Sequence, residues 1–195
     1  MIDAFDFVVR RYREGDAEAV GRLDSHEPPY RPEDRAAVAA MRVRARRAER
    51  RGDPLWMAQP PPAPAVGSGS DDELVVWVAE SRSDRQLIGT VALRRAGASA
   101  ELSRDEPHAV AWRSRADVAE LRGLRIVSAW RRRGVATELN RAAFEWARTN
   151  GVRELVLNTT AAQEPALSLY RKLGFREAFR CYVGEYELIW MSKRL

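Results

Sequence analysis

The sequence is poor in the residues that build disulfides and metal centres. Its 195 residues include one cysteine, Cys181, and two histidines, His26 and His108. A single cysteine excludes a disulfide within the chain, and one cysteine with two distant histidines forms no cluster at metal-ligand spacing. The sequence therefore predicts no metal site.

Long apolar runs are also absent. No run approaches the roughly 18 residues needed to cross a bilayer. The stretch MIDAFDFVVRRYREGD carries acid and alternation where a signal peptide has basic charge and then a continuous apolar stretch. We therefore expect a cytoplasmic protein that does not bind membranes. Its apolar share of 45% is enough for a core, and its length predicts a single domain over 1–195.

Lysine is scarce, and positive charge is carried almost entirely by arginine. The net charge of +5 and the pI near 9.9 are compatible with a phosphorylated cofactor or a nucleic acid and choose neither. The helix predicted within 31–52 is rich in arginine, but most of its arginines lie off its apolar stripe, which favours a solvated face over a nucleic-acid patch. The stripe consists of Ala37, Val38, Met41, Ala45 and Ala48.

Hydrophobic periodicity predicts strands that alternate with helices. Phe5, Phe7 and Val9 alternate as in a strand, and a helix follows from Asp16. Two β-prone runs, ELVVWVAE and QLIGTVALRR, are joined by the polar SRSDR and predict a hairpin. Further along, a strand, a helix that ends at Thr149 and another strand predict a βαβ unit with parallel strands. A helix before Gly174 and two strands around Gly184 follow.

Two segments have no periodic pattern. Residues 59–72 are rich in Pro, Gly and Ser and are expected to form a flexible connection within the domain. Residues 96–117 show no period over a long stretch. Because long loops in compact domains are often functional, this second segment is a candidate for substrate selection.

The stretch AWRRRGVATELNRAAFEWA, which follows the first strand of the βαβ unit, suggests an anion-binding site. Gly134 and Ala136 at the start of a helix would let backbone N–H groups approach a ligand, and the helix dipole favours negative charge there. Three arginines, Arg131, Arg132 and Arg133, would supply counter-charge with a geometry that suits phosphate oxygens. The pattern differs from the glycine fingerprints of dinucleotide-binding and nucleotide-triphosphate loops.

These residues resemble the acetyl-CoA-binding motif of the GCN5-related N-acetyltransferases (GNAT). That motif, Gln/Arg-x-x-Gly-x-Gly/Ala, is met by Arg131, Gly134 and Ala136. A second signature of the family is similar to EPALSLYRKLGFRE, residues 164–177. The resemblance implies an α/β (α+β) fold with a mixed central sheet of six to seven strands, splayed between the fourth and fifth strands and flanked by about four helices.

The resemblance also implies roles for individual residues. Acetyl-CoA would be the co-substrate, with its pantetheine arm along the fourth strand and its pyrophosphate at the following turn. Glu120 matches the general base of several family members, and Tyr170 would stand near the cofactor sulfur as a proton donor. The residues expected to bind the cofactor are Leu124, Ile126, Arg131, Arg132, Arg133, Gly134, Val135, Ala136, Thr137 and Gln163.

Several alternatives remain open for these residues. Gln163 stands where the family often has an asparagine, which puts that cofactor contact in question, and Ser128 replaces a frequent proline. Glu120 could instead face solvent or pair with Arg122, and Tyr170 could be a core residue. For three other polar residues, a purely structural role competes with a role in the site. His108 could be an exposed loop residue, Cys181 a small core residue and Asn158 a polar residue at the end of a strand.

The function expected from the resemblance is transfer of an acetyl group to a primary amine of a small molecule, peptide or protein. Two alternatives are a toxin-like acetyltransferase that acts on aminoacyl-tRNA and a non-catalytic acyl-CoA-binding module. Nucleic acid is the less favoured partner, and a homodimer is open because family members frequently dimerise. The sequence has no readable code for the acceptor.

Overall fold

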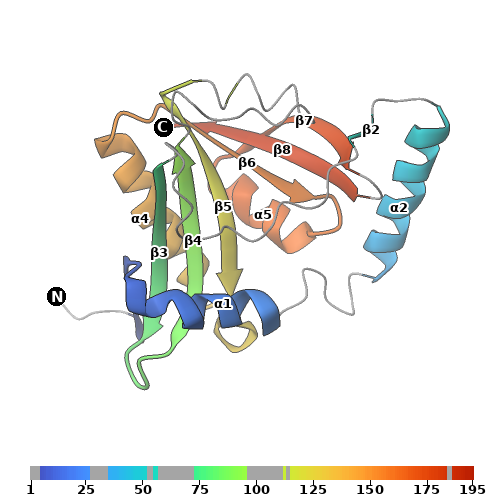
Figure 1. Ribbon diagram of the computed structural model, residues 1–195. Coiled ribbons are helices and arrows are strands. Elements are labelled where there is room, and N and C mark those ends of the chain that lie inside the picture. Colours follow the sequence, from blue (N-terminus) through green and yellow to red (C-terminus); the bar gives the residue numbers. More distant parts are fainter. Residues whose placement is uncertain are drawn as a thin grey trace.

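The computed structural model describes residues 5–26, 35–51, 55–56, 73–95, 112, 115–183 and 186–195, which build one mixed sheet (Figure 1). The strands are β1 (Phe7–Arg11), β2 (Leu55–Trp56), β3 (Glu73–Ser81), β4 (Leu87–Arg95), β5 (Val118–Ile126), β6 (Glu154–Thr160), β7 (Arg176–Val183) and β8 (Tyr186–Arg194). The α-helices are α1 (Ala17–His26), α2 (Arg35–Arg50), α4 (Val135–Thr149) and α5 (Glu164–Lys172). Short 3-10 turns, η1 (Glu14–Asp16) and η3 (Ser128–Trp130), precede α1 and α4.

The sheet has the order β1-β3-β4-β5-β6-β8-β7-β2, with β5 parallel to β6 and β7 parallel to β2. This confirms the expected fold, including the hairpin, the βαβ unit and the four helices. The sheet has one strand more than the six to seven expected. The additional strand is β2, which has two residues and is too short to produce a periodic signal in the sequence. Residues 59–72 and most of 96–117, with His108, lie outside the described residues.

One face of the sheet is covered by α4 and α5, and the main core lies between them and the strands. Alternate residues of β3 point into this core, because successive side chains of a strand face opposite sides. They meet the apolar stripe of α4, which recurs at helical spacing. The buried residues that make this contact are Val75, Trp77, Ala79, Leu139, Ala143, Phe144 and Ala147.

Strand β1 forms an edge of the sheet and is held onto α4 by an arginine. The guanidinium of Arg11 lies over the ring of Trp77 on β3, at 5.0 Å from its centroid, and over that of Trp146 on α4, at 6.0 Å. Cation–π contacts of this kind stabilise by about 0.5–2 kcal/mol. The contact joins β1, β3 and α4 at one point.

The opposite face of the sheet carries α1, which crosses the ends of β4 and β5 (Figure 1). A smaller cluster on this side consists of Val118, Val156, Trp190 and Cys181, with Trp112 and Phe179 stacked at its border. Cys181 is therefore a buried core residue of this cluster.

Helix α2 packs against β8 with its apolar stripe and exposes its arginines. Met41 and Ala45 are buried, whereas Arg46, Arg47 and Arg50 are exposed. Arg44 reaches Glu187 of β8, a carboxylate that is almost fully buried. In the described part of the chain, no helix is long and apolar enough to cross a bilayer.

Candidate active site

The sheet forks between β5 and β6. The two strands pair only from Val118 to Glu120, opposite Glu154 to Val156, and β5 then runs on without β6 as a partner. On its other side, β5 pairs with β4 with an irregular register between Thr90 and Ala92. The second half of β5 therefore presents a backbone edge that β6 does not cover.

A glycine accounts for the bend of β5 at this fork. Gly123 has a φ of 59° and lies where two residues of β5, Gly123 and Leu124, oppose the single residue Val91 of β4. A glycine in the left-handed region is typical of a β-bulge, which bends the strand and increases its local twist. The sequence analysis did not single out Gly123, although an isolated glycine within a strand is a signal for a bulge.

The end of β5 leads through η3 into the turn that begins α4. In this turn Arg132 and Gly134 both have left-handed backbones, with φ of 59° and 85°. Gly134 is the N-cap of α4. The first backbone N–H groups of a helix have no acceptor within the helix, and Gly134 has no side chain that could accept a hydrogen bond from them. Such a helix start attracts an anion.

The β5 edge and this turn line one open cavity of about 1340 Å³. Helix α1 and the turn between β3 and β4 form another part of the wall, and α5 contributes a third. The residues that α5 and its cap present are Gln163, Pro165, Ala166, Ser168, Leu169 and Lys172. Four separate segments of the chain thus line one cavity.

The charge of the cavity wall is strongly positive. Among the described residues, Asp16 is the only acidic residue that lines it, and the guanidinium of Arg10 holds the pKa of Asp16 below its usual range. The cationic residues in the wall are Arg10, Arg22, Arg85, Arg125, Arg131, Arg132 and Lys172. Because like charges at close range repel one another, this wall favours an anionic ligand.

Nine of the ten residues predicted to bind the cofactor line this cavity. These are Leu124, Ile126, Arg131, Arg132, Gly134, Val135, Ala136, Thr137 and Gln163. The exception is Arg133, whose guanidinium lies over the ring of Trp130 at 5.2 Å from the centroid. Arg131 also braces the turn, because its Nε donates a hydrogen bond of 3.2 Å to the carbonyl oxygen of Ile126. At the start of α5, Gln163 accepts a hydrogen bond of 2.8 Å from the Thr159 hydroxyl.

Glu120 is the last residue of β5 that pairs with β6, and it therefore stands at the fork. Its side chain is buried, and its Oε1 lies 3.9 Å from Nε of Arg122. It does not line the cavity. Of the alternatives for Glu120, the structure excludes a solvent-facing carboxylate and places Arg122 at the outer limit of an ion pair.

Tyr170 lies in the main core on α5, with its ring packed edge-on against Phe175 at 5.8 Å between centroids. Burial raises the pKa of Tyr170 to about 12, against a smaller opposite effect from the charge of Arg125. Arg125 is a cavity residue, so the phenol senses the charge of the cavity wall although Tyr170 does not line it. At neutral pH this phenol is protonated.

Three further cationic residues of the wall were not among the residues predicted to bind the cofactor. They are Lys172 on α5, Arg22 on α1 and Arg85 in the β3–β4 turn. Lys172 follows Tyr170 by two positions, but only the folded helix shows that it faces the cavity. Asn158 is half-buried and does not line the cavity. Among the described residues, no group of three or more His, Cys, Asp and Glu could hold a metal ion.

Comparison with known proteins identifies the family. The chain matches the model of the acetyltransferase (GNAT) family over residues 44–175. N-acetylaspartate synthetase of Danio rerio is 41% identical over 111 residues, which cover 57% of this chain and 31% of that protein. N-alpha-acetyltransferase 30 of Schizosaccharomyces pombe is 39% identical over 59 residues, which cover 30% of this chain and 39% of that protein.

Solved structures share the fold. NAA60 of Arabidopsis thaliana, in complex with a bisubstrate analogue, superimposes with a TM-score of 0.63 at 19% identity, over 97% of this chain and 99% of that one. The chain spans less than half the length of the curated relatives that it matches. From the match to the family model, which extends over more than half of its residues, the chain belongs to the acetyltransferase (GNAT) family.

Proposed function

We propose that this protein transfers an acetyl group from acetyl-CoA to a primary amine, and that 1–195 form one domain for this reaction. The observation that carries the proposal is the continuous path from the uncovered edge of β5 to the N-terminus of α4 within one cationic cavity. An extended arm with amide groups can add to a strand edge, and a diphosphate suits a helix start. Acetyl-CoA has both parts in this order.

The residues present fit this cofactor. Leu124 and Ile126 would hold the arm through the backbone of β5, and Gly134 through Thr137 would meet the diphosphate with main-chain N–H groups. Arg132 and Lys172 add positive charge to the same wall. When bound, acetyl-CoA supplies a thioester, an activated acetyl group that an amine can attack.

Glu120 is proposed as the general base. An alkylammonium group has a pKa of about 10.4 and must lose a proton before its nitrogen can attack a carbonyl carbon. A carboxylate at the fork of the sheet, directly or through a water molecule, would accept this proton. Arg122 lies beside this carboxylate, with its Nε 3.9 Å from Oε1 of Glu120.

Tyr170 is proposed as the hydrogen-bond donor to the departing thiolate. A phenol with a pKa of about 12 keeps its proton at neutral pH and can donate a hydrogen bond. A thiol has a pKa near 8.5, so that complete proton transfer from this phenol to the thiolate is uphill. Stabilisation of the negative charge by the hydrogen bond is therefore the main effect that we expect from Tyr170.

Replacement of Tyr170 by Phe should lower kcat by about tenfold or more, because it removes this donor and little of the packing. Affinity for acetyl-CoA, measured by isothermal titration, should change by less than about twofold, because the proposed hydrogen bond strengthens only as the thiolate leaves. An equal kcat in the variant would remove Tyr170 from the mechanism.

The same variant tests the burial of the phenol. Above pH 10 the unfolded chain releases the Tyr170 proton, whereas the folded protein keeps it up to about pH 12. The free energy of unfolding should therefore fall by about 2 kcal/mol more in the wild type than in Tyr170→Phe as the pH rises from 10 to 12. The free energy of unfolding is measured by denaturant titration at each pH. If it fell equally with pH in both proteins, the burial of an ionisable phenol at this position would be contradicted.

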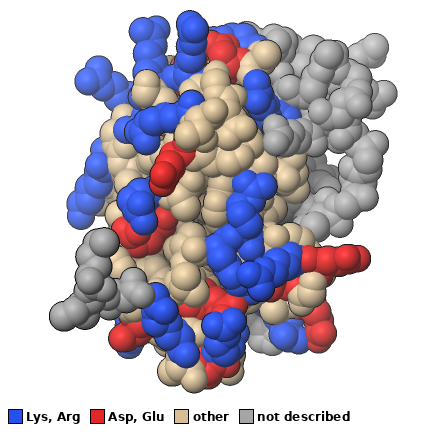
Figure 2. Space-filling view, turned by 90° about the vertical axis from the view of Figure 1, so that its left-hand side faces the viewer, with Lys and Arg blue, Asp and Glu red and all other residues tan. Residues whose placement is uncertain are grey.

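The acceptor is proposed only as a primary amine. The named relatives include an N-alpha-acetyltransferase and an N-acetylaspartate synthetase, which points to amines of peptides or of small molecules. A basic stripe for tRNA has less support. On the face seen in Figure 2, Lys and Arg side chains are frequent, but Asp and Glu side chains lie between them. Some of the arginines are paired with carboxylates, such as Arg141 with Glu138 on α4.

A thiol-release assay with acetyl-CoA and a panel of amines tests the proposed function. The panel contains free amino acids, peptides with a free N-terminus, polyamines and aminoacyl-tRNA. Release of coenzyme A that depends on a primary amine supports the proposal, and release only with aminoacyl-tRNA favours the toxin-like alternative. Binding of acetyl-CoA with no turnover on any amine would favour a non-catalytic module.

A further inference from the structure

Two residues other than glycine have a left-handed backbone in the described part of the chain, and both are arginines in the wall of the same cavity. They are Arg85, with a φ of 61°, and Arg132, with a φ of 59°. Such a backbone costs an L-residue roughly 1–2 kcal/mol, and the cost is commonly borne at functional sites. Arg132 belongs to the proposed diphosphate turn, but no role has yet been given to Arg85.

Arg85 lies in the tight turn that joins β3 to β4. The turn is closed by backbone hydrogen bonds from Arg85 N to Ser81 O and from Ser81 N to Gln86 O. Positions of this kind with positive φ usually hold Gly or Asn, which avoid the steric cost. An arginine at this position therefore points to a use for its side chain.

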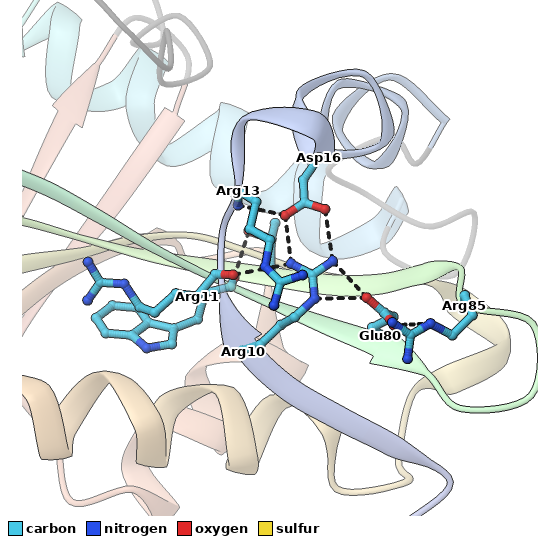
Figure 3. Close-up of polar contacts among 8 residues, drawn as sticks. Arg10, Arg11, Arg13, Asp16, Glu80 and Arg85 are labelled. Carbon is cyan, nitrogen blue, oxygen red and sulfur yellow. Dashed lines mark hydrogen bonds and ion pairs between the residues drawn. The ribbon is translucent and has the colours of Figure 1, made fainter.

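A buried carboxylate orients the side chain of Arg85 (Figure 3). Glu80 of β3 is almost fully buried, and its Oε1 lies 2.7 Å from Nε of Arg85. Its Oε2 accepts a hydrogen bond of 2.8 Å from Nε of Arg10 on β1. The charge of Glu80 is therefore already balanced by Arg10, and the contact with Arg85 orients the Arg85 side chain.

Arg10 is in turn held by the start of α1. Its Nη1 and Nη2 donate hydrogen bonds of 2.7 and 2.9 Å to the two carboxylate oxygens of Asp16 (Figure 3). Arg10 is therefore saturated by two carboxylates and has little capacity for a ligand. Arg85 differs, because Glu80 meets it at Nε and its side chain is 73% exposed, which leaves the other N–H donors of the guanidinium for a ligand.

We propose that Arg85 is a second anion-binding residue of the cavity, which receives a phosphate or carboxylate group of a bound substrate at the wall made by α1 and the β3–β4 turn. The inference rests on the proposed function, because it assigns this group to the cofactor or to the amine acceptor. The guanidinium would bind the anion through charge-assisted hydrogen bonds. Glu80 and Arg10 act as positioning residues that fix its direction.

The first arm of the test compares coenzyme A with dephospho-coenzyme A, which lacks the ribose 3′-phosphate. Affinities are measured by isothermal titration for the wild type, Arg85→Gly and Arg82→Gln. If the anion is this phosphate, Arg85→Gly should weaken coenzyme A by about tenfold and leave dephospho-coenzyme A unchanged. Arg82 is the matched control, since it lies in the same turn and does not line the cavity.

The second arm tests a carboxylate of the acceptor. Aspartate is titrated into protein saturated with coenzyme A, with asparagine as the neutral comparison. If the anion belongs to the acceptor, the wild type should prefer aspartate by about tenfold, and Arg85→Gly should lose this preference while both coenzyme A ligands bind as before.

Stability separates a binding role from a structural one. Glycine accepts a φ of 61° without strain, so Arg85→Gly should melt at or above the wild-type temperature while one of the two affinities falls. An unchanged response to all four ligands would overturn the inference. If the wild type binds neither coenzyme A nor dephospho-coenzyme A, the proposed function itself fails, which is a different result.

Discussion

Gly134→Glu is expected to lower the affinity for acetyl-CoA by at least about 100-fold, which corresponds to about 2.7 kcal/mol. Gly134 has a φ of 85°, and an added Cβ would lie 3.3 Å from Cε1 of Phe5. A glutamate there would strain the turn and place a carboxylate at the helix start, where the cofactor diphosphate is proposed to bind. Isothermal titration measures the change.

Gly151→Glu is the matched control for this variant. Gly151 follows the other end of the same helix, has a φ of 76°, and has no atom within 4 Å of an added Cβ. The backbone cost of the substitution is therefore similar, but the residue is not part of the cavity wall. Equal losses of affinity in the two variants would show that the effect comes from the fold, and would withdraw the diphosphate site from the turn.

Glu120→Gln is expected to lower kcat by about 100-fold or more, because general base catalysis contributes about 10²–10⁴. An amide keeps the shape of the side chain but cannot accept a proton from the ammonium group. The wild type should lose activity toward low pH as its base becomes protonated, and this acid limb should be missing in the variant. The measurement is the pH profile of kcat over a range in which both proteins remain folded.

Glu154→Gln serves as the control for Glu120. Glu154 lies on β6 at the other end of the same short parallel pairing, and its carboxylate is held by Arg115 at 2.8 Å. Its replacement should leave kcat and the acid limb unchanged. An acid limb that persists in Glu120→Gln would assign the role of general base to water or to another residue. Affinity for acetyl-CoA should be the same in both variants.

The local parts of the site were predictable from the sequence. Gly134 and Ala136 at the start of a strongly amphipathic helix, directly after a β-prone run, indicate a strand, a turn and a helix start through conformational preferences that act within a few residues. The second signature around Tyr170 has the same local character. Gly123 carried a comparable signal, because a glycine within a strand indicates a bulge, but the strand pattern around it hid its importance.

The remaining wall of the cavity depends on contacts between residues that are far apart in the chain. Arg10 binds Glu80 on the neighbouring strand, and Arg85 lines the cavity only because the β3–β4 turn lies beside α1. No period or spacing encodes such contacts. For the same reason the sequence could name Glu120 and Tyr170 as candidates but could not decide between the alternative surroundings that it left open for each of them.

The sequence by itself determined the fold class, the turn at the start of α4 and the excess of arginine, because periodicity, glycine conformation and charge are local properties. Tertiary structure alone decided which arginines face the cavity and which contact other groups of the protein. Arg133 stacks on Trp130 and Arg10 is saturated by carboxylates, whereas Arg85 and Arg132 reach the cavity with strained backbones. The physical reason is that a charge takes its role from the groups packed around it, and these groups come together only when the chain folds.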